Sequence, residues 1–360
     1  MQIYQRHKSK GVALITALLV TSIATITAVA LASRQHLDIR RTANVLESEQ
    51  AYVYALGLET VAKKLLTQYT AATQDFDDPS MLYAPYTFPV DGGTISGNLI
   101  DMESLFNINS LLDKDGKPDD IPKDRFERLL KSVLTDINED TGRAPDLVNA
   151  VIDWIDENTE TTFPGGAEDG EYLAKDKPYR PANRFMANAT ELAMVEGFTN
   201  ELLYGITPDD DQGLGGIAEE EVEPIKGLLS YVAALPRRKT TINVNTASDK
   251  VLKMFSSHIT DSRLDELNQD WPYDNLDTFK DHPAFVGLDK DEKNKLKQDI
   301  NNGMTVQSHY FKILATAQIG NSYAQLNTLL YRNLQGGAKV VTVSRAQGIM
   351  GFEYAGKSIN

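Results

Sequence analysis

Residues 12–33 read VALITALLVTSIATITAVALAS, a run of 22 residues without a charged side chain. At ~1.5 Å rise per residue a helix of this length is about 33 Å long, which matches the ~30 Å hydrocarbon layer of a membrane. The preceding residues 1–11, MQIYQRHKSKG, carry Arg6, Lys8 and Lys10 but no acidic residue. The sequence therefore predicts a transmembrane helix that follows a short basic leader.

A cleaved secretory signal peptide is the alternative interpretation of the same stretch. Such a peptide has a shorter apolar region, and its small-residue cleavage site follows that region. Here the small residue Gly11 precedes the apolar run, so cleavage after Gly11 would leave the helix on the mature chain. Apolar residues then continue at helical spacing, with charged residues on the other faces. We expect one helix from Val12 to about Tyr69, half in lipid and half packed on a soluble domain.

Six segments, in order along the chain, resemble the minor pseudopilin K (GspK) family of the type II secretion system. They are KGVALITALLV (10–20), IRRTANVLESEQAYVYALG (39–57), FPVDGGTISGNLIDMESLFNINSLL (88–112), VIDWIDENTETTFPGGAEDGEY (151–172), PYRPANRFMANATEL (178–192) and TINVNTAS (241–248). The resemblance extends from Gly11 to at least Asn333. It implies cleavage after Gly11 by a prepilin peptidase and methylation of the new amine at Val12.

The resemblance also implies a function, a location and partners. Pilins of this class carry a Glu at the fifth position after the cleaved Gly, where this chain has Thr16. A carboxylate in lipid is retained only where it has a partner, so its absence favours a subunit at the end of a filament over chance variation at one position. The implied protein is a non-enzymatic minor pseudopilin that caps or initiates the pseudopilus tip and supports export across the outer membrane. It would contact the minor pseudopilins I, J and H and the major pseudopilin G. A single pass would anchor it in the inner membrane, with its C-terminal part in the periplasm.

The expected fold class is α+β, with a type IV pilin-like fold. It combines the long N-terminal, partly transmembrane helix, a small antiparallel sheet and a large all-α domain inserted between the strands. The expected divisions are a prepilin leader (1–11), the transmembrane half (12–33) and the periplasmic half (34–70) of the N-terminal helix, the first part of the pilin α/β domain (71–110), the inserted helical domain with helix-hairpin-helix or SAM-like segments (111–305), the C-terminal strands of the pilin domain (306–346) and a flexible tail (347–360).

Local patterns place the individual elements. Alternating apolar residues predict strands at 94–101, 311–319, 325–332 and 339–344, with turns at 91–93 and 320–322. Helical spacing predicts helices at 126–137, 147–155, 191–195, 223–234, 249–255 and 290–301. Pro79, Pro85 and Pro89 predict an irregular connection before the first strand.

Acidic and amide side chains gather after Trp154. Asp153, Asp156, Asn158, Glu160, Glu168 and Asp169 offer hard oxygen ligands, and Gly165 and Gly166 allow the chain to fold back. Calcium takes ~6–8 such oxygens, although the spacing is not that of an EF-hand and a solvated acidic loop is the alternative. The resemblance implies a helical domain that binds calcium. We therefore expect Ca²⁺ to be held by Asp156, Asn158, Glu160, Glu168 and Asp169.

Two motifs raise other functions. GFEYAGKS (351–358) fits the phosphate-binding loop, but only two residues follow it, so no helix supplies the dipole for a nucleotide. TINVNTAS (241–248) resembles the opening of a helix-hairpin-helix module, with a weaker echo in FNINS (106–110). A tight turn capped by Asn side chains is the alternative. A DNA-uptake or adhesion-type minor pilin that uses this segment stays open as the second function.

Composition limits the remaining possibilities. The chain has 360 residues, a net charge of −15 and no Cys. The acidic excess argues against nucleic-acid partners, which require cationic side chains on the phosphates. The missing Cys excludes disulfides, thiolate nucleophiles and Cys-ligated zinc. The five His are scattered without a hydrolase or zinc motif, so we expect no catalytic residues and no small-molecule substrate.

Overall fold

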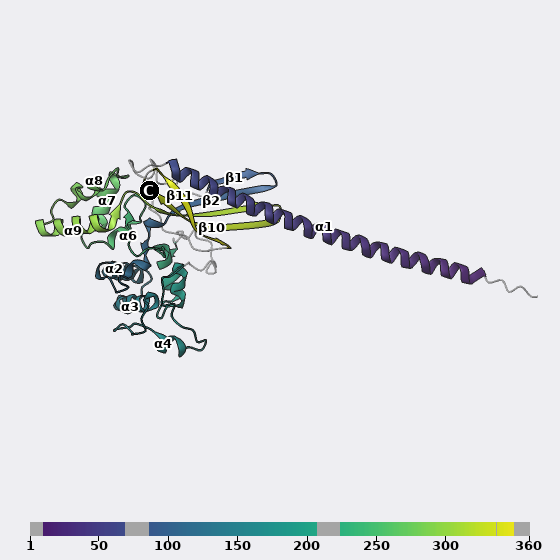
Figure 1. Cartoon of the computed structure of the whole chain (residues 1–360), viewed down its shortest axis with the longest axis horizontal. Helices are drawn as coiled ribbons and strands as arrows, with labels where there is room; N and C mark the ends of the chain where they lie inside the picture. Colours follow the sequence, from purple (N-terminus) through teal and green to yellow (C-terminus); the bar gives the residue numbers. More distant parts are fainter. Residues whose placement is uncertain (1–9, 69–85, 207–223, 336, 349–360) are drawn as a thin grey trace, which may run out of the picture.

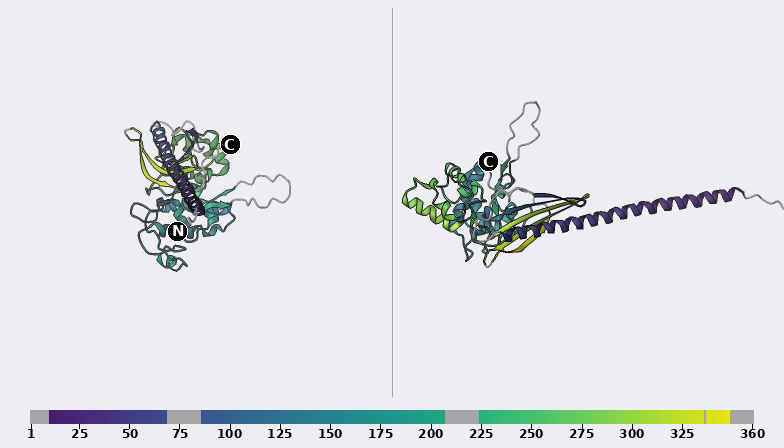
Figure 2. Two further views of the ribbon diagram at one scale, coloured as in Figure 1. Left: turned by 90° about the vertical axis from the view of Figure 1, so that its right-hand side faces the viewer. Right: turned by 90° about the horizontal axis from the view of Figure 1, so that it is seen from above.

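The computed structural model describes residues 10–68, 86–206, 224–335 and 337–348. It contains one long helix, a five-stranded sheet and a mainly helical region (Figure 1). Helix α1 (Lys10–Gln68) is continuous over 59 residues, as the apolar periodicity predicts. Its second half lies on the sheet, and its first half extends away from the rest of the molecule as a rod (Figures 1 and 2).

The sheet is antiparallel throughout and joins two distant parts of the chain. Its order is β1 (Tyr86–Val90), β2 (Gly93–Asp101), β9 (Tyr310–Ile319), β10 (Ser322–Asn333) and β11 (Lys339–Gln347). The strands expected at 94–101, 311–319, 325–332 and 339–344 are all present. Gly92 has a φ of +83°, so glycine suits the tight turn between β1 and β2.

Two expectations for individual segments differ from the structure. The expected irregular connection runs through Pro79, Pro85 and Pro89. At Pro89 the structure instead has the edge strand β1, which tolerates proline because among the described strands it pairs with β2 alone. Pro79 and Pro85 lie outside the described residues. The helix expected over 223–234 is not helical in its described residues. The chain there forms β5 (Ile225–Lys226), a 3-10 turn (Leu228–Ser230) and β6 (Val232–Ala233). Pairing of β5 and β6 with distant segments outweighs the local apolar pattern.

Small side chains allow α1 to lie close to the sheet. Ala51, Ala55 and Ala62 are buried at helical spacing, together with Leu58 and Leu66. This stripe packs on the inward side chains of β9 and β10, which alternate along each strand. The amphipathic half of α1 therefore forms one core with the sheet.

One buried carboxylate fixes the register of α1 on the sheet. Glu59 on α1 is 3% exposed and accepts hydrogen bonds from Thr328 on β10 (3.0 Å) and Thr342 on β11 (2.9 Å). Arg345 on β11 donates to both carboxylate oxygens (2.8 and 2.9 Å), and Lys63 forms an ion pair at 2.7 Å. Burial alone would raise the pKa of Glu59, but these hydrogen bonds outweigh it and lower the pKa to about 2.

Replacing Glu59 with Gln is expected to lower the free energy of unfolding by about 3 kcal/mol at pH 7, because the cations lose a buried partner. The native contribution is fully present above pH 4.5, the ordinary pKa of the group, and is lost as the pH falls towards 2. Denaturant unfolding at several pH values measures both effects. Glu49→Gln, an exposed change on the same helix, is the control. Equal stability of the two variants at pH 7 would contradict this role.

The region between β2 and β9 is mainly helical but not all-α as expected. Its helices are α2 (Asp120–Asp136), α3 (Ala144–Ile155), α4 (Asp169–Leu173), α5 (Asn200–Tyr204), α6 (Asp249–Lys253), α7 (Asp261–Gln269), α8 (Leu276–Lys280) and α9 (Lys290–Gly303). Three pairs of two-residue strands interrupt them, namely β3 (Phe106–Asn107) with β6, β4 (Gly205–Ile206) with β5, and β7 (Ile242–Asn243) with β8 (Met304–Thr305). Helical periodicity cannot predict these pairs because each joins segments far apart in the sequence.

The two Asn motifs have the same local geometry, and each anchors one part of the inserted region. Asn107 and Asn243 each end a short strand in a parallel pair, and each accepts a hydrogen bond from the backbone of the Asn two residues later. The side-chain amide of that second Asn donates to the backbone C=O of a distant residue and accepts from the N–H of the same residue. The distant residue is Met186 for Asn109 and Tyr273 for Asn245. We call these two parts repeat unit 1 (residues 102–235) and repeat unit 2 (residues 236–309).

Asp101, the last residue of β2, joins the sheet to repeat unit 2. Its side chain is fully buried, and Oδ2 accepts hydrogen bonds from Thr246 (2.6 Å), Ser308 (2.6 Å) and Asn243 (3.3 Å). Oδ1 accepts from the backbone of Glu103 (2.8 Å). The points at which the chain leaves and re-enters the sheet are therefore tied to each other and to the second Asn motif.

Candidate functional site

The first half of α1 is suited to a lipid environment. Within the described residues, α1 is the helix long and apolar enough to cross a membrane, and its most apolar window is not buried by the rest of the chain. The Thr and Ser hydroxyls in it donate to backbone carbonyls three or four residues earlier, as Thr16 does to Val12 (3.1 Å). These bonds satisfy polar groups that lipid cannot. Gly11 and Val12, the predicted processing site, lie in the first turn of α1.

Beyond the apolar run, α1 also carries exposed apolar side chains on the face opposite the sheet. Ile39, Leu46, Val53 and Val61 are each 61–65% exposed. The first three recur every seven residues and so share one face. Gly57 lies on the same side, and a Cβ added there would meet nothing within 4 Å. We call these five residues the outer face of α1.

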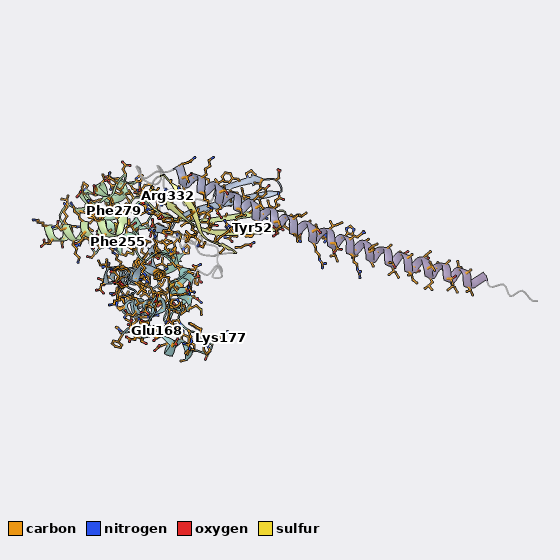
Figure 3. The ribbon with its side chains drawn as sticks, in the orientation of Figure 1. Tyr52, Glu168, Lys177, Phe255, Phe279 and Arg332 are labelled. Atoms are coloured by element: carbon orange, nitrogen blue, oxygen red, sulfur yellow. The ribbon has the colours of Figure 1, made fainter. Side chains whose placement is uncertain are left out.

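The acidic loop brings three carboxylates into one buried cluster. Asp153 and Asp156 lie at the end of α3 and just after it, and Glu168 immediately precedes α4. All three are 0–3% exposed. Both carboxylate oxygens of Glu168 are buried without a hydrogen-bond partner. Figure 3 shows Glu168 in the lobe that holds α3 and α4, away from α1.

Burial and mutual repulsion change the acidity of the cluster. Burial raises the pKa of Asp156 to about 6, and the charge of Asp153 contributes to the shift. Burial raises the pKa of Glu168 to about 7, with repulsion from Asp153 and Asp156 adding to it. The pKa of Asp153 is also raised by burial. Ionising these carboxyl groups is therefore more costly than ionising free ones, because their own hydrogen bonds do not offset burial and mutual repulsion.

The five expected calcium ligands occupy different environments. Asp156 and Glu168 lie in the cluster. Asn158 is exposed and donates to Asp156 (2.8 Å), while the exposed Glu160 donates its backbone N–H to Asn158 (2.6 Å). Asp169 is half-buried and forms an ion pair with Arg180. Asp153 is not among the five expected ligands but belongs to the cluster. Its i, i+3 spacing from Asp156 is the sequence signal that identifies it.

The cluster has the chemistry of a hard-cation site but does not close around one. Carboxylate oxygens are the ligands that calcium prefers, and the unpartnered oxygens of Glu168 can accept a cation. No three described Asp, Glu or His side chains are close enough together to hold a metal ion. Gly166 packs directly on the carboxylate of Asp153, since an added Cβ would lie 2.2 Å from its Oδ2. This contact allows the loop to fold over the end of α3.

The structure argues against a nucleic-acid role for the two Asn motifs. Asn107, Asn109, Asn243 and Asn245 are at most 2% exposed, and their amides donate hydrogen bonds inside the inserted region. The motifs therefore act as buried turns, as their capping chemistry indicates. The phosphate-loop match at 351–358 and most of the expected tail lie outside the described residues.

The chain thus combines one N-terminal helix that is long and apolar enough to cross a membrane, a small antiparallel sheet and a bulky insert, an arrangement consistent with membrane anchoring. A family model described as type II secretion system (T2SS), protein K, matches residues 104–208. A type II secretion system protein K from Aeromonas hydrophila is 27% identical, covering 95% of this chain and 98% of the relative. One from Pseudomonas aeruginosa is 29% identical, covering 95% of each.

A solved structure is similar in fold. It is a chain from the crystal structure of the GspK–GspI–GspJ complex of enterotoxigenic Escherichia coli, with a TM-score of 0.65 and 22% sequence identity. The similarity covers 86% of this chain and all of that one. Together with the sequence matches, this shows that the chain is similar to K proteins of the type II secretion system along most of its length.

Proposed function

We propose that this chain is the minor pseudopilin that caps the tip of a type II pseudopilus, with a structural and non-enzymatic role. The observation that carries the proposal is the similarity to K proteins over 95% of the chain. We propose that α1 anchors the chain in the inner membrane and that the sheet and insert lie in the periplasm. Cleavage after Gly11 and methylation of Val12 would precede assembly.

The shape of the chain supports a position at the filament end. Helix α1 on its sheet is the part that we propose to be pilin-like, and the repeat units lie at the end of the molecule opposite the free half of α1 (Figure 1). A bulky region on that side would obstruct the addition of a further subunit above it. Thr16 supports the same position, because its hydroxyl is satisfied by its own helix and needs no partner amine.

The outer face of α1 is the proposed contact for other pseudopilins. Its exposed apolar side chains lie beyond the predicted membrane span, so lipid does not cover them. Gly57 weakens the helix relative to Ala by about 1 kcal/mol, yet no atom of the described residues lies within 4 Å of a Cβ added there. A glycine at a helix surface permits close approach of a second helix. A solved relative forms a complex with proteins I and J, and we propose their N-terminal helices as the partners, with H and the major pseudopilin G further along the filament.

The double variant Leu46→Glu, Val53→Glu is expected to stay folded and in the membrane, because both side chains are exposed. Its recovery of the I and J proteins is expected to fall about tenfold or more, since two charges would be buried at the contact. Co-purification from detergent-solubilised membranes measures the effect. Val286→Glu, an equally drastic change at a 73% exposed residue of repeat unit 2, is the control. Unchanged recovery of both partners by the double variant would reject this interface.

We also propose that the cluster of Asp153, Asp156 and Glu168 binds Ca²⁺, with Asn158, Glu160 and Asp169 as further candidate ligands. The unpartnered oxygens of Glu168 support this proposal. When bound, the ion would neutralise the repulsion between the carboxylates and hold the loop after α3 to the start of α4. Its role would be to stabilise repeat unit 1 and not to take part in a reaction.

A further inference from the structure

A cleft lies between the two repeat units. It has a volume of about 550 Å³, within the ~300–1,000 Å³ range of ligand sites. Repeat unit 1 contributes its 106–125 segment, and repeat unit 2 contributes residues 238–255 and Asn302. Apolar side chains form much of the wall, among them Phe106, Met254 and Phe255. Phe255 is labelled in Figure 3, within the helical region.

Arg125, on α2, is the notable polar residue of this wall. Its side chain is 92% buried, since only 8% is exposed, and its guanidinium stacks over Phe255 at 4.2 Å. A guanidinium carries five N–H donors. Among the described residues it makes one hydrogen bond, to the carbonyl of Asp299 at 3.3 Å, and no ion pair. Its remaining N–H groups are available to an anion that enters the cleft.

The other charges of the cleft also favour an anionic ligand. Lys114 and Lys239 are exposed and form no ion pair among the described residues. Arg238 stacks on Phe185 and donates to the carbonyl of Asp113 (2.5 Å). The two carboxylates in the wall already have donors, because Asp113 accepts from two backbone N–H groups and Asp119 caps the start of α2. The cleft is thus a basic site in a chain whose net charge is −15.

We propose that this cleft binds a short acidic peptide segment. Its carboxylate would meet Arg125 and Lys239, and an adjoining apolar side chain would pack on Phe255 and Met254. A planar guanidinium suits a carboxylate because two parallel hydrogen bonds form. The inference does not depend on filament assembly, since the cleft lies wholly within the inserted region.

The test uses the full chain in detergent and a fluorescent, acetylated and amidated pentapeptide in which two glutamates flank a phenylalanine. The peptide is expected to bind, with affinity falling as salt rises. Its glutamine counterpart is expected to bind about tenfold more weakly. A glutamine peptide with a free C-terminal carboxylate distinguishes a chain terminus from an acidic side chain as the source of the anion.

Variants distinguish binding in this cleft from nonspecific attraction of an acidic peptide to basic side chains elsewhere on the chain. Lys239→Gln changes an exposed residue, so the fold should be unaffected, and Arg125→Lys keeps the charge but loses the planar fork. Each is expected to weaken binding about tenfold. Lys64→Gln, which removes one exposed cation from α1, is the matched control. Equal weakening by Lys64→Gln, no weakening by Lys239→Gln, or equal binding of the acidic and glutamine peptides would overturn the proposal.

Discussion

Calcium is expected to raise the midpoint of thermal unfolding of the purified chain above its value in chelator. A ligand that binds only the folded state raises the free energy of unfolding by about 4 kcal/mol when its concentration is 1,000 times its dissociation constant. The expectation rests on Asp153, Asp156 and Glu168, which are buried beside one another, with both oxygens of Glu168 unpartnered. Trp154 adjoins the cluster in the sequence, so intrinsic fluorescence is a suitable signal.

The effect of calcium on stability is also expected to depend on pH. In metal-free protein the pKa values of Asp156 and Glu168, about 6 and 7, exceed their ordinary values of 3.8 and 4.5. The folded state therefore holds protons that the unfolded state releases, and these two groups make stability fall as the pH rises from about 4 to 7. Calcium binds the ionised carboxylates, so its stabilising effect is expected to grow over the same interval.

Substitutions define which side chains take part. Glu168→Gln and Asp156→Asn are expected to remove most of the calcium-dependent shift, and each should stabilise the metal-free chain at pH 8 by relieving repulsion. Glu160→Gln tests whether the exposed loop contributes a ligand. Asp115→Asn, in another acidic turn, is the control for loss of one negative charge. An identical midpoint in saturating calcium and in chelator would reject the site.

Replacing Asp101 with Ala is expected to lower the free energy of unfolding by about 4 kcal/mol. The change leaves the donors of Thr246, Ser308 and Asn243 buried without this acceptor, and such losses are among the most destabilising of single substitutions. Because Asp101 lies where the sheet meets repeat unit 2, the effect should reach both parts.

Two measurements test this coupling. Denaturant unfolding gives the loss of stability, and hydrogen exchange at the backbone of Asn243 and Tyr310 shows whether protection falls in repeat unit 2 and in β9 together. Asp91→Ala, at the exposed turn between β1 and β2, is the control and should change stability by less than about 0.5 kcal/mol. If only one of the two parts lost protection, Asp101 would not couple them.

The sequence predicts the elements whose signal is local. Helix α1 follows from an uncharged run and its amphipathic continuation, and β9 follows from strict alternation between Phe311 and Ile319. The edge strand β1 is missed because Pro89 weakens the strand signal, although an edge position tolerates it. The helix expected at 223–234 is wrong because β6 pairs with Phe106, more than a hundred residues earlier.

Sites that depend on tertiary contacts are predicted only in part. Spacing after Trp154 points to the acidic loop, but burial decides which carboxylates gather, and it selects Asp153 and Glu168 over the exposed Glu160. The similarity of FNINS to INVNT is visible in the sequence, while their shared burial is not. The cleft at Arg125 has no sequence signal, since its walls come from two repeat units.

We propose that this chain is a processed pseudopilin whose N-terminal helix stays on the mature protein. Intact mass and N-terminal sequencing of the chain extracted from membranes test it most directly. We expect the mature chain to begin at Val12 with a methylated amine and to contain an intact α1. A mature chain that begins at Met1, or one cut after Ala32 at the end of the apolar run, would contradict it.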